Sequence, residues 1–233
     1  MINVEKKDFV ELKYTGYANG KLFDSNIPEE LKKIDSSVAP KKVIVAVGEE
    51  MVVKGLDNAL IGKEIGKEYE IIIQPKDGFG ERKREYVKTI PLAAFKEKNV
   101  NPYPGMVLTL DNFMVRIITI SGARVVTDFN NPLSGKILHY KFIITRKVTD
   151  EKEKIDALFE GLFKFIPEYE IKEKVIIKGP RGFEIFVKSF NAKFKELIGK
   201  ELGFEEKKIE EKKKEEKGEK DIVADDKKVE EKL

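Results

Sequence analysis

Residues 69–82 read Tyr-Glu-Ile-Ile-Ile-Gln-Pro-Lys-Asp-Gly-Phe-Gly-Glu-Arg. The apolar run Tyr69–Pro75 is short and is bounded by glycine and proline, which is typical of a strand that ends in a turn. Gly78 and Gly80 then flank one aromatic residue, Phe79. The stretch therefore predicts a strand followed by a glycine-punctuated segment that carries an aromatic side chain.

Three more strands are predicted on either side of this stretch. Phe9–Thr15 alternates between apolar and polar residues, Val43–Val47 is a second short apolar run, and Ile137–Arg146 alternates again. Leu56–Ile61 has the length of one short helix, which Gly62 can end. The predicted fold class is α+β, an antiparallel sheet wrapped on a short helix. This domain comprises residues 1–83 plus 129–150.

Residues 84–128 interrupt that domain. Pro91–Lys98 is predicted to be a short helix, and three β-rich runs follow at Met106–Leu110, Phe113–Ile120 and Arg124–Phe129. A segment of this length is too long for a structureless loop in a compact domain. We therefore expect a small β-rich domain inserted into the first one.

Residues 151–204 are predicted to form a small α/β domain. Lys154–Phe165 and Phe190–Leu202 have helical spacing, and Glu173–Ile177 and Phe183–Val187 are expected to form a strand pair between them. Its core is small, so we expect it to pack on something else, with a second copy of itself as one candidate.

The last segment, residues 205–233, is predicted to be a charged tail. Of its 29 residues, 22 are charged. Such a segment cannot bury enough apolar surface to offset the entropy of ordering, although alternating charges can support a solvated helix. It is expected to be helical or disordered.

Composition narrows the function classes. The chain has 45 basic and 42 acidic side chains, which are interspersed, so a nucleic acid is not an expected partner. The sequence contains no run of 18 or more apolar residues, so a membrane is not an expected partner either. Met1–Lys7 is polar and resembles no secretory signal. Zero cysteines exclude disulfides and thiol catalysis. A cytoplasmic location is the expectation.

The sequence lacks the residues that hydrolytic and metal-dependent catalysis require. His139 is the only histidine, and the sequence contains no G-x-S-x-G elbow, P-loop or G-x-G-x-x-G motif. A single imidazole cannot build a histidine-based metal site. We expect no metal and no cofactor, and a structural or surface role for His139.

Several glycine-punctuated motifs occur in a fixed order. They are Tyr14-Thr15-Gly16, Phe23-Asp24-Ser25, Met51-Val52-Val53-Lys54-Gly55-Leu56-Asp57, Asp77-Gly78-Phe79-Gly80-Glu81-Arg82 and Asp128-Phe129-Asn130-Asn131-Pro132-Leu133-Ser134-Gly135-Lys136. In this order they resemble the FKBP-type peptidyl-prolyl cis/trans isomerases over about residues 4–150. The interrupted flap is similar to the SlyD-like branch with an insert-in-flap domain, and the C-terminal addition is similar to long-type archaeal members.

The resemblance implies a proline pocket. The matching positions are Tyr14, Phe23, Asp24, Val52, Val53, Leu56, Phe79 and Tyr140, and Val43 is expected to join them. Two positions depart from the family: Leu56 stands where Trp is often found, and Phe79 stands where Tyr is usual. Phe79 lacks the hydroxyl that would bond the substrate carbonyl. Taken singly, each of these aromatic residues reads as ordinary core packing.

The insert is interpreted as a chaperone surface. Its apolar residues are Met106, Val107, Leu108, Phe113, Met114, Ile117, Ile118 and Ile120. They are more numerous than so small a module readily buries, and flexible Met side chains with an open strand edge suit unfolded chains. The alternative, that these residues fill the insert's own core, accounts for some of them.

The resemblance thus implies an isomerase and folding chaperone whose partners are proline-containing peptides and unfolded or nascent proteins. A non-catalytic holdase chaperone with the same surfaces is the alternative, motivated by Leu56 and Phe79. A third reading is an assembly module that forms a homodimer through the C-terminal domain.

Overall fold

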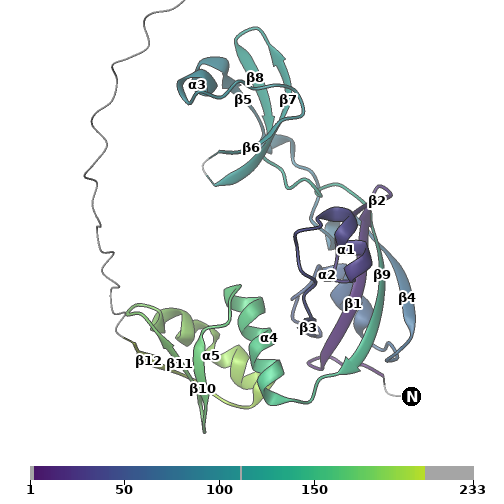
Figure 1. Cartoon of the computed structure of the whole chain (residues 1–233), viewed down its shortest axis with the longest axis vertical. Helices are drawn as coiled ribbons and strands as arrows, with labels where there is room; N and C mark the ends of the chain where they lie inside the picture. Colours follow the sequence, from purple (N-terminus) through teal and green to yellow (C-terminus); the bar gives the residue numbers. More distant parts are fainter. Residues whose placement is uncertain (1–2, 111, 208–233) are drawn as a thin grey trace, which may run out of the picture.

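Three sheets organise the computed structural model, which describes residues 3–110 and 112–207 (Figure 1). The main sheet lies between a sheet formed by the insert at one end and a sheet formed by the C-terminal residues at the other. The elements of the main unit are β1 (Phe9–Ala18), β2 (Lys21–Ser25), α1 (Pro28–Ile34), β3 (Val43–Ala46), α2 (Lys54–Leu60), β4 (Glu68–Ile73), a 3-10 turn (Pro75–Asp77) and β9 (Leu138–Lys147).

The main sheet is antiparallel, with the order β2-β1-β9-β4 and β3 paired to the other end of β1. One amide side chain fills the gap between β2 and β3. The Tyr14 backbone N–H donates to Asn26 Oδ1 at 2.8 Å, and Asn26 Nδ2 donates to the Leu12 carbonyl at 2.7 Å. The Asn26 side chain therefore forms the hydrogen bonds that a neighbouring strand would otherwise form, and it satisfies these two backbone groups at the edge of β1.

Helix α2 packs on one face of this sheet. Leu56 and Leu60 are 1% and 0% exposed, and they join a core with Leu12, Leu138 and Ile144. The predicted α+β class is confirmed. Helix α1 was not predicted, because the segment that contains it was read as a loop; none of its residues is buried, so no apolar periodicity marks it.

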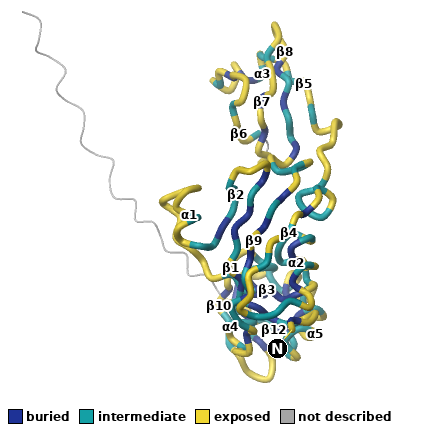
Figure 2. Tube along the Cα trace, turned by 90° about the vertical axis from the view of Figure 1, so that its right-hand side faces the viewer, coloured by how far each residue is buried: buried dark blue, intermediate teal, exposed yellow. Residues whose placement is uncertain are grey.

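The insert forms a four-stranded antiparallel sheet with the order β5-β8-β7-β6. Its elements are a 3-10 turn (Arg84–Tyr86), β5 (Val87–Pro91), α3 (Leu92–Glu97), β6 (Val107–Leu110), β7 (Phe113–Ser121) and β8 (Arg124–Asp128). Phe95, Ile117 and Val125 form its small buried core, and much of the remaining insert is exposed (Figure 2). Strand β5 was not predicted.

The two connections between the insert and the main sheet are tied together. Arg82 donates twice to Asp128 Oδ2, at 3.0 and 2.7 Å. The Lys83 backbone N–H donates to Asn130 Oδ1, and Asn130 Nδ2 donates back to the Lys83 carbonyl, both at 2.9 Å. These contacts give a physical role to the Asp-Phe-Asn motif, because its polar side chains hold together the two segments that connect the insert to the main sheet.

The C-terminal unit corrects two predictions. It contains α4 (Glu151–Phe163), β10 (Glu168–Ile171), β11 (Val175–Gly179), α5 (Glu184–Ile198) and β12 (Leu202–Glu206). The predicted strand at Phe183–Val187 is wrong, since these residues begin helix α5, and β11 pairs with β10 and β12 instead. The predicted helix to Leu202 ends at Ile198, because Gly199 adopts a left-handed φ of 84°.

The division of the chain at residues 204 and 205 is also corrected, since β12 continues to Glu206. The remainder of the predicted tail, 208–233, lies outside the described residues. The other domain boundaries stay predictions.

The C-terminal unit shares its core with the main sheet. Phe9 and Ala46, from β1 and β3, are buried in the same cluster as Phe159 and Phe194 from α4 and α5. Above this core, Glu153 accepts from both Lys42 and Arg146 at 2.5 and 2.8 Å. Helix α4 therefore packs directly on the main sheet, and removing it would expose apolar residues of β1 and β3.

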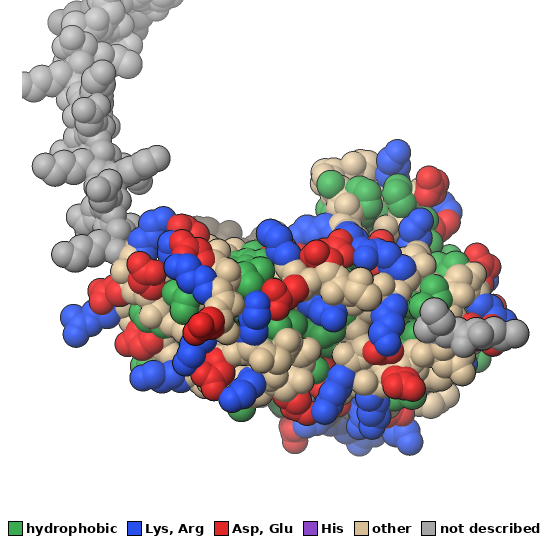
Figure 3. Space-filling view, turned by 90° about the horizontal axis from the view of Figure 1, so that it is seen from below, with side chains coloured by type: hydrophobic (Ala, Val, Ile, Leu, Met, Phe, Trp, Pro, Cys, Tyr) green, Lys and Arg blue, Asp and Glu red, His purple; other side chains and the backbone are tan. Residues whose placement is uncertain are grey.

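Charge is finely mixed over the surface. In the view from below, basic and acidic side chains alternate across the main and C-terminal units (Figure 3). Within the described part of the chain, none of the helices combines the length and the apolar character needed to cross a bilayer.

Candidate active site

Four aromatic side chains meet beside helix α2. Tyr14 comes from β1, Phe23 from β2, Phe79 from the turn after β4 and Tyr140 from β9. The ring centroids of Tyr14 and Tyr140 are 6.0 Å apart, those of Phe23 and Tyr140 5.8 Å, and those of Phe23 and Phe79 6.0 Å. We call this group the aromatic cluster. Residues far apart in sequence thus converge on one apolar wall.

The loop before α2 and the helix itself supply the aliphatic side. Val52, Val53 and Val43 are half-buried and pack on the same core as the aromatic cluster, and Leu56 is buried within it. An apolar ligand can contact these half-buried side chains without any unfolding of the protein, because each remains partly exposed while Leu56 forms a buried base.

Asp24 adds the polar group of this region. The Tyr14 hydroxyl donates to Asp24 Oδ2 at 3.1 Å. Burial raises the pKa of the Asp24 carboxyl, against the lowering effect of this hydrogen bond. Burial is the largest cause that raises the pKa of Tyr14, and the nearby Asp24 charge is the second. The same two causes raise the pKa of Tyr140. Both phenols therefore stay protonated at neutral pH, and the single hydroxyl hydrogen of Tyr14 is donated to Asp24.

Glycines allow the close approach of these walls. A Cβ at Gly16 would lie 2.9 Å from Tyr140 Cε1 and 3.0 Å from Phe23 Cζ. A Cβ at Gly55 would lie 2.4 Å from Ile73 Cγ2. Any larger residue at position 16 must push the two aromatic rings apart. The glycine of the Tyr-Thr-Gly motif therefore sets the geometry of the aromatic cluster.

Asp57 holds the loop that carries Val52 and Val53. It is 2% exposed, and its carboxylate accepts from the backbone N–H groups of Gly48 and Glu50, both at 2.9 Å. The two bonds anchor the loop to helix α2. The sequence motif that contains Asp57 predicts no role for it; the signal is an acidic residue between the apolar residues Leu56 and Leu60 of a short helix.

The structure brings the predicted pocket residues together. Seven of them belong to the main core or pack against it, and Asp24 is bonded to Tyr14. These seven are Tyr14, Phe23, Val52, Val53, Leu56, Phe79 and Tyr140. Their role in binding proline stays a prediction.

The predicted chaperone residues divide into two groups. Val107, Phe113, Met114 and Ile118 are exposed by 54%, 61%, 59% and 41%. Ile117 is 0% exposed in the insert's own core, and Met106, Leu108 and Ile120 pack against that core. The assignment of Ile117 to a surface is therefore wrong: its side chain points inward from β7, while its neighbours Arg116 and Ile118 point outward.

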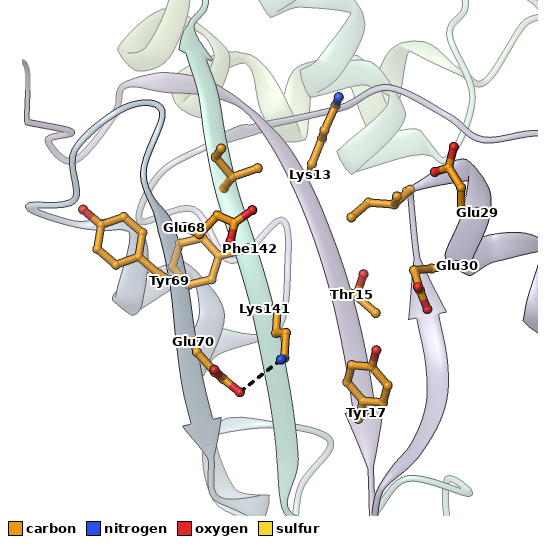
Figure 4. A pocket seen from close by; sticks show the side chains of 12 residues that line it. Lys13, Thr15, Tyr17, Glu29, Glu30, Glu68, Tyr69, Glu70, Lys141 and Phe142 are labelled. Atoms are coloured by element: carbon orange, nitrogen blue, oxygen red, sulfur yellow. Dashed lines mark ion pairs between the residues drawn. The ribbon is translucent and has the colours of Figure 1, made fainter.

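The opposite face of the main sheet carries a separate hollow that the sequence did not predict. It has a volume of about 620 Å³ and is lined by Lys13, Thr15 and Tyr17 of β1, by Glu29 and Glu30 of α1, and by residues of β4 and β9 (Figure 4). Lys141 pairs with Glu70 at 3.5 Å, and His139 lies beside the same carboxylate at 2.5 Å. Of its other charged lining residues, Glu30 is paired with Lys33, which lies outside the hollow. Among the described residues, no three His, Asp or Glu side chains are grouped as metal ligands.

The fold and the aromatic cluster define an α+β protein of the FKBP type, and comparison with known proteins agrees. Residues 2–96 match the family model of the FKBP-type peptidyl-prolyl cis-trans isomerases, and residues 88–133 match that of the FKBP26 IF domain. A short-type peptidyl-prolyl cis-trans isomerase of Methanocaldococcus jannaschii is 32% identical over 155 residues, covering 64% of this chain and 96% of the relative.

Two SlyD proteins are also similar. That of Treponema pallidum is 31% identical over 124 residues, covering 51% of this chain and 70% of its own, and that of Helicobacter pylori is 26% identical over 125 residues, covering 51% and 67%. The chain belongs to the family of FKBP-type peptidyl-prolyl cis-trans isomerases.

Proposed function

We propose that this chain catalyses cis–trans isomerisation of X-Pro bonds at the aromatic cluster, and that its insert holds unfolded client chains near that site. The observation that carries the proposal is the convergence of Tyr14, Phe23, Phe79 and Tyr140 on the base formed by Leu56, in a chain of this family. A cysteine-free chain fits a reducing, cytoplasmic location.

The chemistry requires no nucleophile. Amide resonance sets a barrier of about 18–20 kcal/mol for rotation, and at the transition state the bond is twisted and its carbonyl less polar. An apolar wall disfavours the planar, polar ground state more than the twisted one, and this difference lowers the barrier. Each ~1.4 kcal/mol of difference gives a tenfold increase in rate.

Asp24 is the proposed polar contact within this apolar site. Its carboxylate is positioned by the Tyr14 hydroxyl. A carboxylate in a partly desolvated position orients dipoles more strongly than it would in water. It is proposed to steer the twisted carbonyl or a neighbouring backbone group of the substrate.

A protease-free assay of X-Pro isomerisation in a short peptide tests the enzyme assignment. The wild type is expected to accelerate the exchange, and Tyr14→Ala to lower kcat/KM about tenfold or more, because it removes one aromatic wall and the partner of Asp24. Tyr17→Ala is the matched control, since Tyr17 lies on the same strand but on the other face of the sheet. An unchanged rate in Tyr14→Ala and Asp24→Ala would refute the assignment of the site.

Phe79→Tyr is expected to raise kcat/KM by roughly two- to tenfold. The added hydroxyl restores a donor for the substrate carbonyl, and one hydrogen bond contributes about 0.5–1.5 kcal/mol. Phe129→Tyr, which adds a hydroxyl to a half-buried ring outside the aromatic cluster, should have no effect. If Phe79→Tyr leaves kcat/KM unchanged, Phe79 does not face the substrate carbonyl.

The client-holding part of the proposal rests on the exposed residues of the insert. Val107 and Met114 lie on adjacent strands, and β6 is the edge strand of its sheet. An open edge with apolar neighbours can pair with an extended chain by strand addition. The non-catalytic holdase is the alternative, and it predicts client binding without any acceleration of the peptide.

A homodimer is proposed through the C-terminal unit. Phe165, Ile166, Ile185 and Phe186 are exposed there by 52%, 49%, 69% and 56%. The rings of Phe165 and Phe186 both lie near that of Phe183, with centroids 6.1 and 5.8 Å away, and exposed apolar side chains grouped in this way favour a protein interface. The expected mass in solution is that of a dimer, and Ile185→Lys/Phe186→Lys should give a monomer. A monomeric wild type would remove this part of the proposal.

A further inference from the structure

A groove lies between the insert and the main unit, apart from the aromatic cluster. Its volume is about 400 Å³. One wall is the outward face of the insert sheet, with Val107, Met114 and Arg116 from β6 and β7, and the other is the segment 130–136 that leads into β9. A volume of this size holds a few residues of an extended peptide.

The groove is physically joined to the candidate active site. The Ser134 hydroxyl donates to the Phe79 carbonyl at 3.0 Å, and the Gly135 N–H donates to the Gly80 carbonyl at 2.8 Å. The segment that lines the groove therefore holds the turn that carries Phe79. Arg82, three residues further on, lines the groove itself. Three residues of chain span at most about 11 Å, so an extended ligand covers this path in three or four residues.

The charges in the groove are unbalanced. Arg82, Arg116 and Lys136 line it together with one carboxylate, Asp128. Both oxygens of Asp128 are engaged, Oδ2 by Arg82 and Oδ1 by the Asn130 backbone and side-chain N–H groups. Although burial alone would raise the pKa of Asp128, these hydrogen bonds lower it, so the carboxylate stays ionised and is paired with Arg82.

Two cations remain for a ligand. Among the described residues, Arg116 and Lys136 form no ion pair within 4.0 Å. They are accompanied by apolar side chains, because Val107 and Met114 are exposed by 54% and 59% and Pro132 also lines the groove. A ligand that complements both features is an extended peptide with apolar residues and a carboxylate side chain.

We propose that this groove is a specificity subsite that selects client segments with an acidic side chain a few residues from the proline. The proposal rests on the proposed isomerase function, since it assigns the groove to the substrate of that site. Arg116 and Lys136 attract and position the carboxylate, while Val107 and Met114 contact the intervening apolar residues. Because both cations belong to a solvent-accessible groove, the preference falls as salt screens them.

Paired peptides test the subsite with the full chain. Each peptide contains one proline and carries Glu or Gln at the second, third, fourth or fifth position before or after it. At low salt, the wild type is expected to have a kcat/KM about three- to tenfold higher for the Glu peptide at one or two of these positions, mainly through KM. Raising the salt to about 0.5 M should abolish the difference.

Charge variants locate the effect. Arg116→Gln/Lys136→Gln should remove the preference and leave turnover of the Gln peptide unchanged, whereas Arg116→Glu/Lys136→Glu should favour a Lys peptide instead. Arg124→Gln, an exposed arginine of β8 outside the groove, is the matched control and should behave as wild type. Equal rates for Glu and Gln peptides at every position, or a preference that survives Arg116→Gln/Lys136→Gln, would overturn the subsite.

The subsite and the isomerase function fail in different ways. Turnover of Gln peptides with no Glu preference leaves the function intact and removes the subsite. If neither peptide is turned over, the function fails, and fluorescence anisotropy of labelled Glu and Gln peptides then decides the subsite by binding alone. Tighter binding of the Glu peptide that is lost in Arg116→Gln/Lys136→Gln supports it, and equal binding refutes it.

Discussion

Gly16→Ala is expected to lower kcat/KM for X-Pro isomerisation by at least about tenfold while the protein stays folded. The added Cβ would stand 2.9 Å from Tyr140 and 3.0 Å from Phe23, so both rings must move. They form two walls of the proposed proline site, and displacement of a binding group by about 1 Å is sufficient to lose one or two orders of magnitude in rate.

The control for this prediction is a glycine that is crowded elsewhere. A Cβ at Gly203, in the C-terminal sheet, would lie 2.6 Å from Ile176 Cδ1. Gly203→Ala should therefore cost a comparable amount of stability and leave kcat/KM within about twofold of wild type. If Gly16→Ala retains full activity at an unchanged melting temperature, the two rings are not walls of the site.

Deleting residues 84–128 is expected to separate the two parts of the proposed function. The bonds between Asn130 and Lys83 hold the ends of the insert together, so a short Gly-rich turn can replace it. The rate for a short peptide should remain within about twofold. Acceleration of proline-limited refolding of an unfolded protein should fall by about tenfold to a hundredfold, because the insert no longer raises the local concentration of the chain.

Point variants give the same test without a deletion. Phe113→Ser/Met114→Ser removes two exposed side chains of the insert and should weaken only the refolding activity. Ile72→Ser, at an equally exposed position on β4, is the matched control. Equal losses on the peptide and on the refolding protein in the deletion variant would contradict the proposed division of labour.

Sequence patterns predicted the main sheet because its strands are buried on one face. Phe9–Thr15 and Ile137–Arg146 alternate, and their inward residues Leu12 and Ile144 are 1% and 0% exposed. The prediction failed at Phe183–Val187, a short apolar-rich run after a Gly-Pro-Arg-Gly turn that also fits a helical stripe continuing to Phe194. Phe183 and Phe194 pack against Phe163 and Phe159 of helix α4, and this packing favours the helix over a strand. No local sequence pattern indicates such a tertiary contact.

The side chains that line the candidate site were predictable from the sequence, but the residues that hold its loops and strand edge in place were not. The motifs that carry Tyr14, Phe23 and Phe79 are specific in combination, and the structure brings these residues together. Asp57 and Asn26 were missed, because each satisfies backbone groups that only the folded loops bring within reach. The groove at Arg116 was missed for a similar reason, since it forms only where two distant segments meet.

The most direct measurement is exchange spectroscopy by NMR on a short X-Pro peptide with a catalytic amount of the full chain. The account predicts faster cis–trans exchange of the peptide, together with shifts in the resonances of Tyr14, Val52 and Val53. A peptide that exchanges at its uncatalysed rate, or that binds and perturbs only the insert, would contradict it.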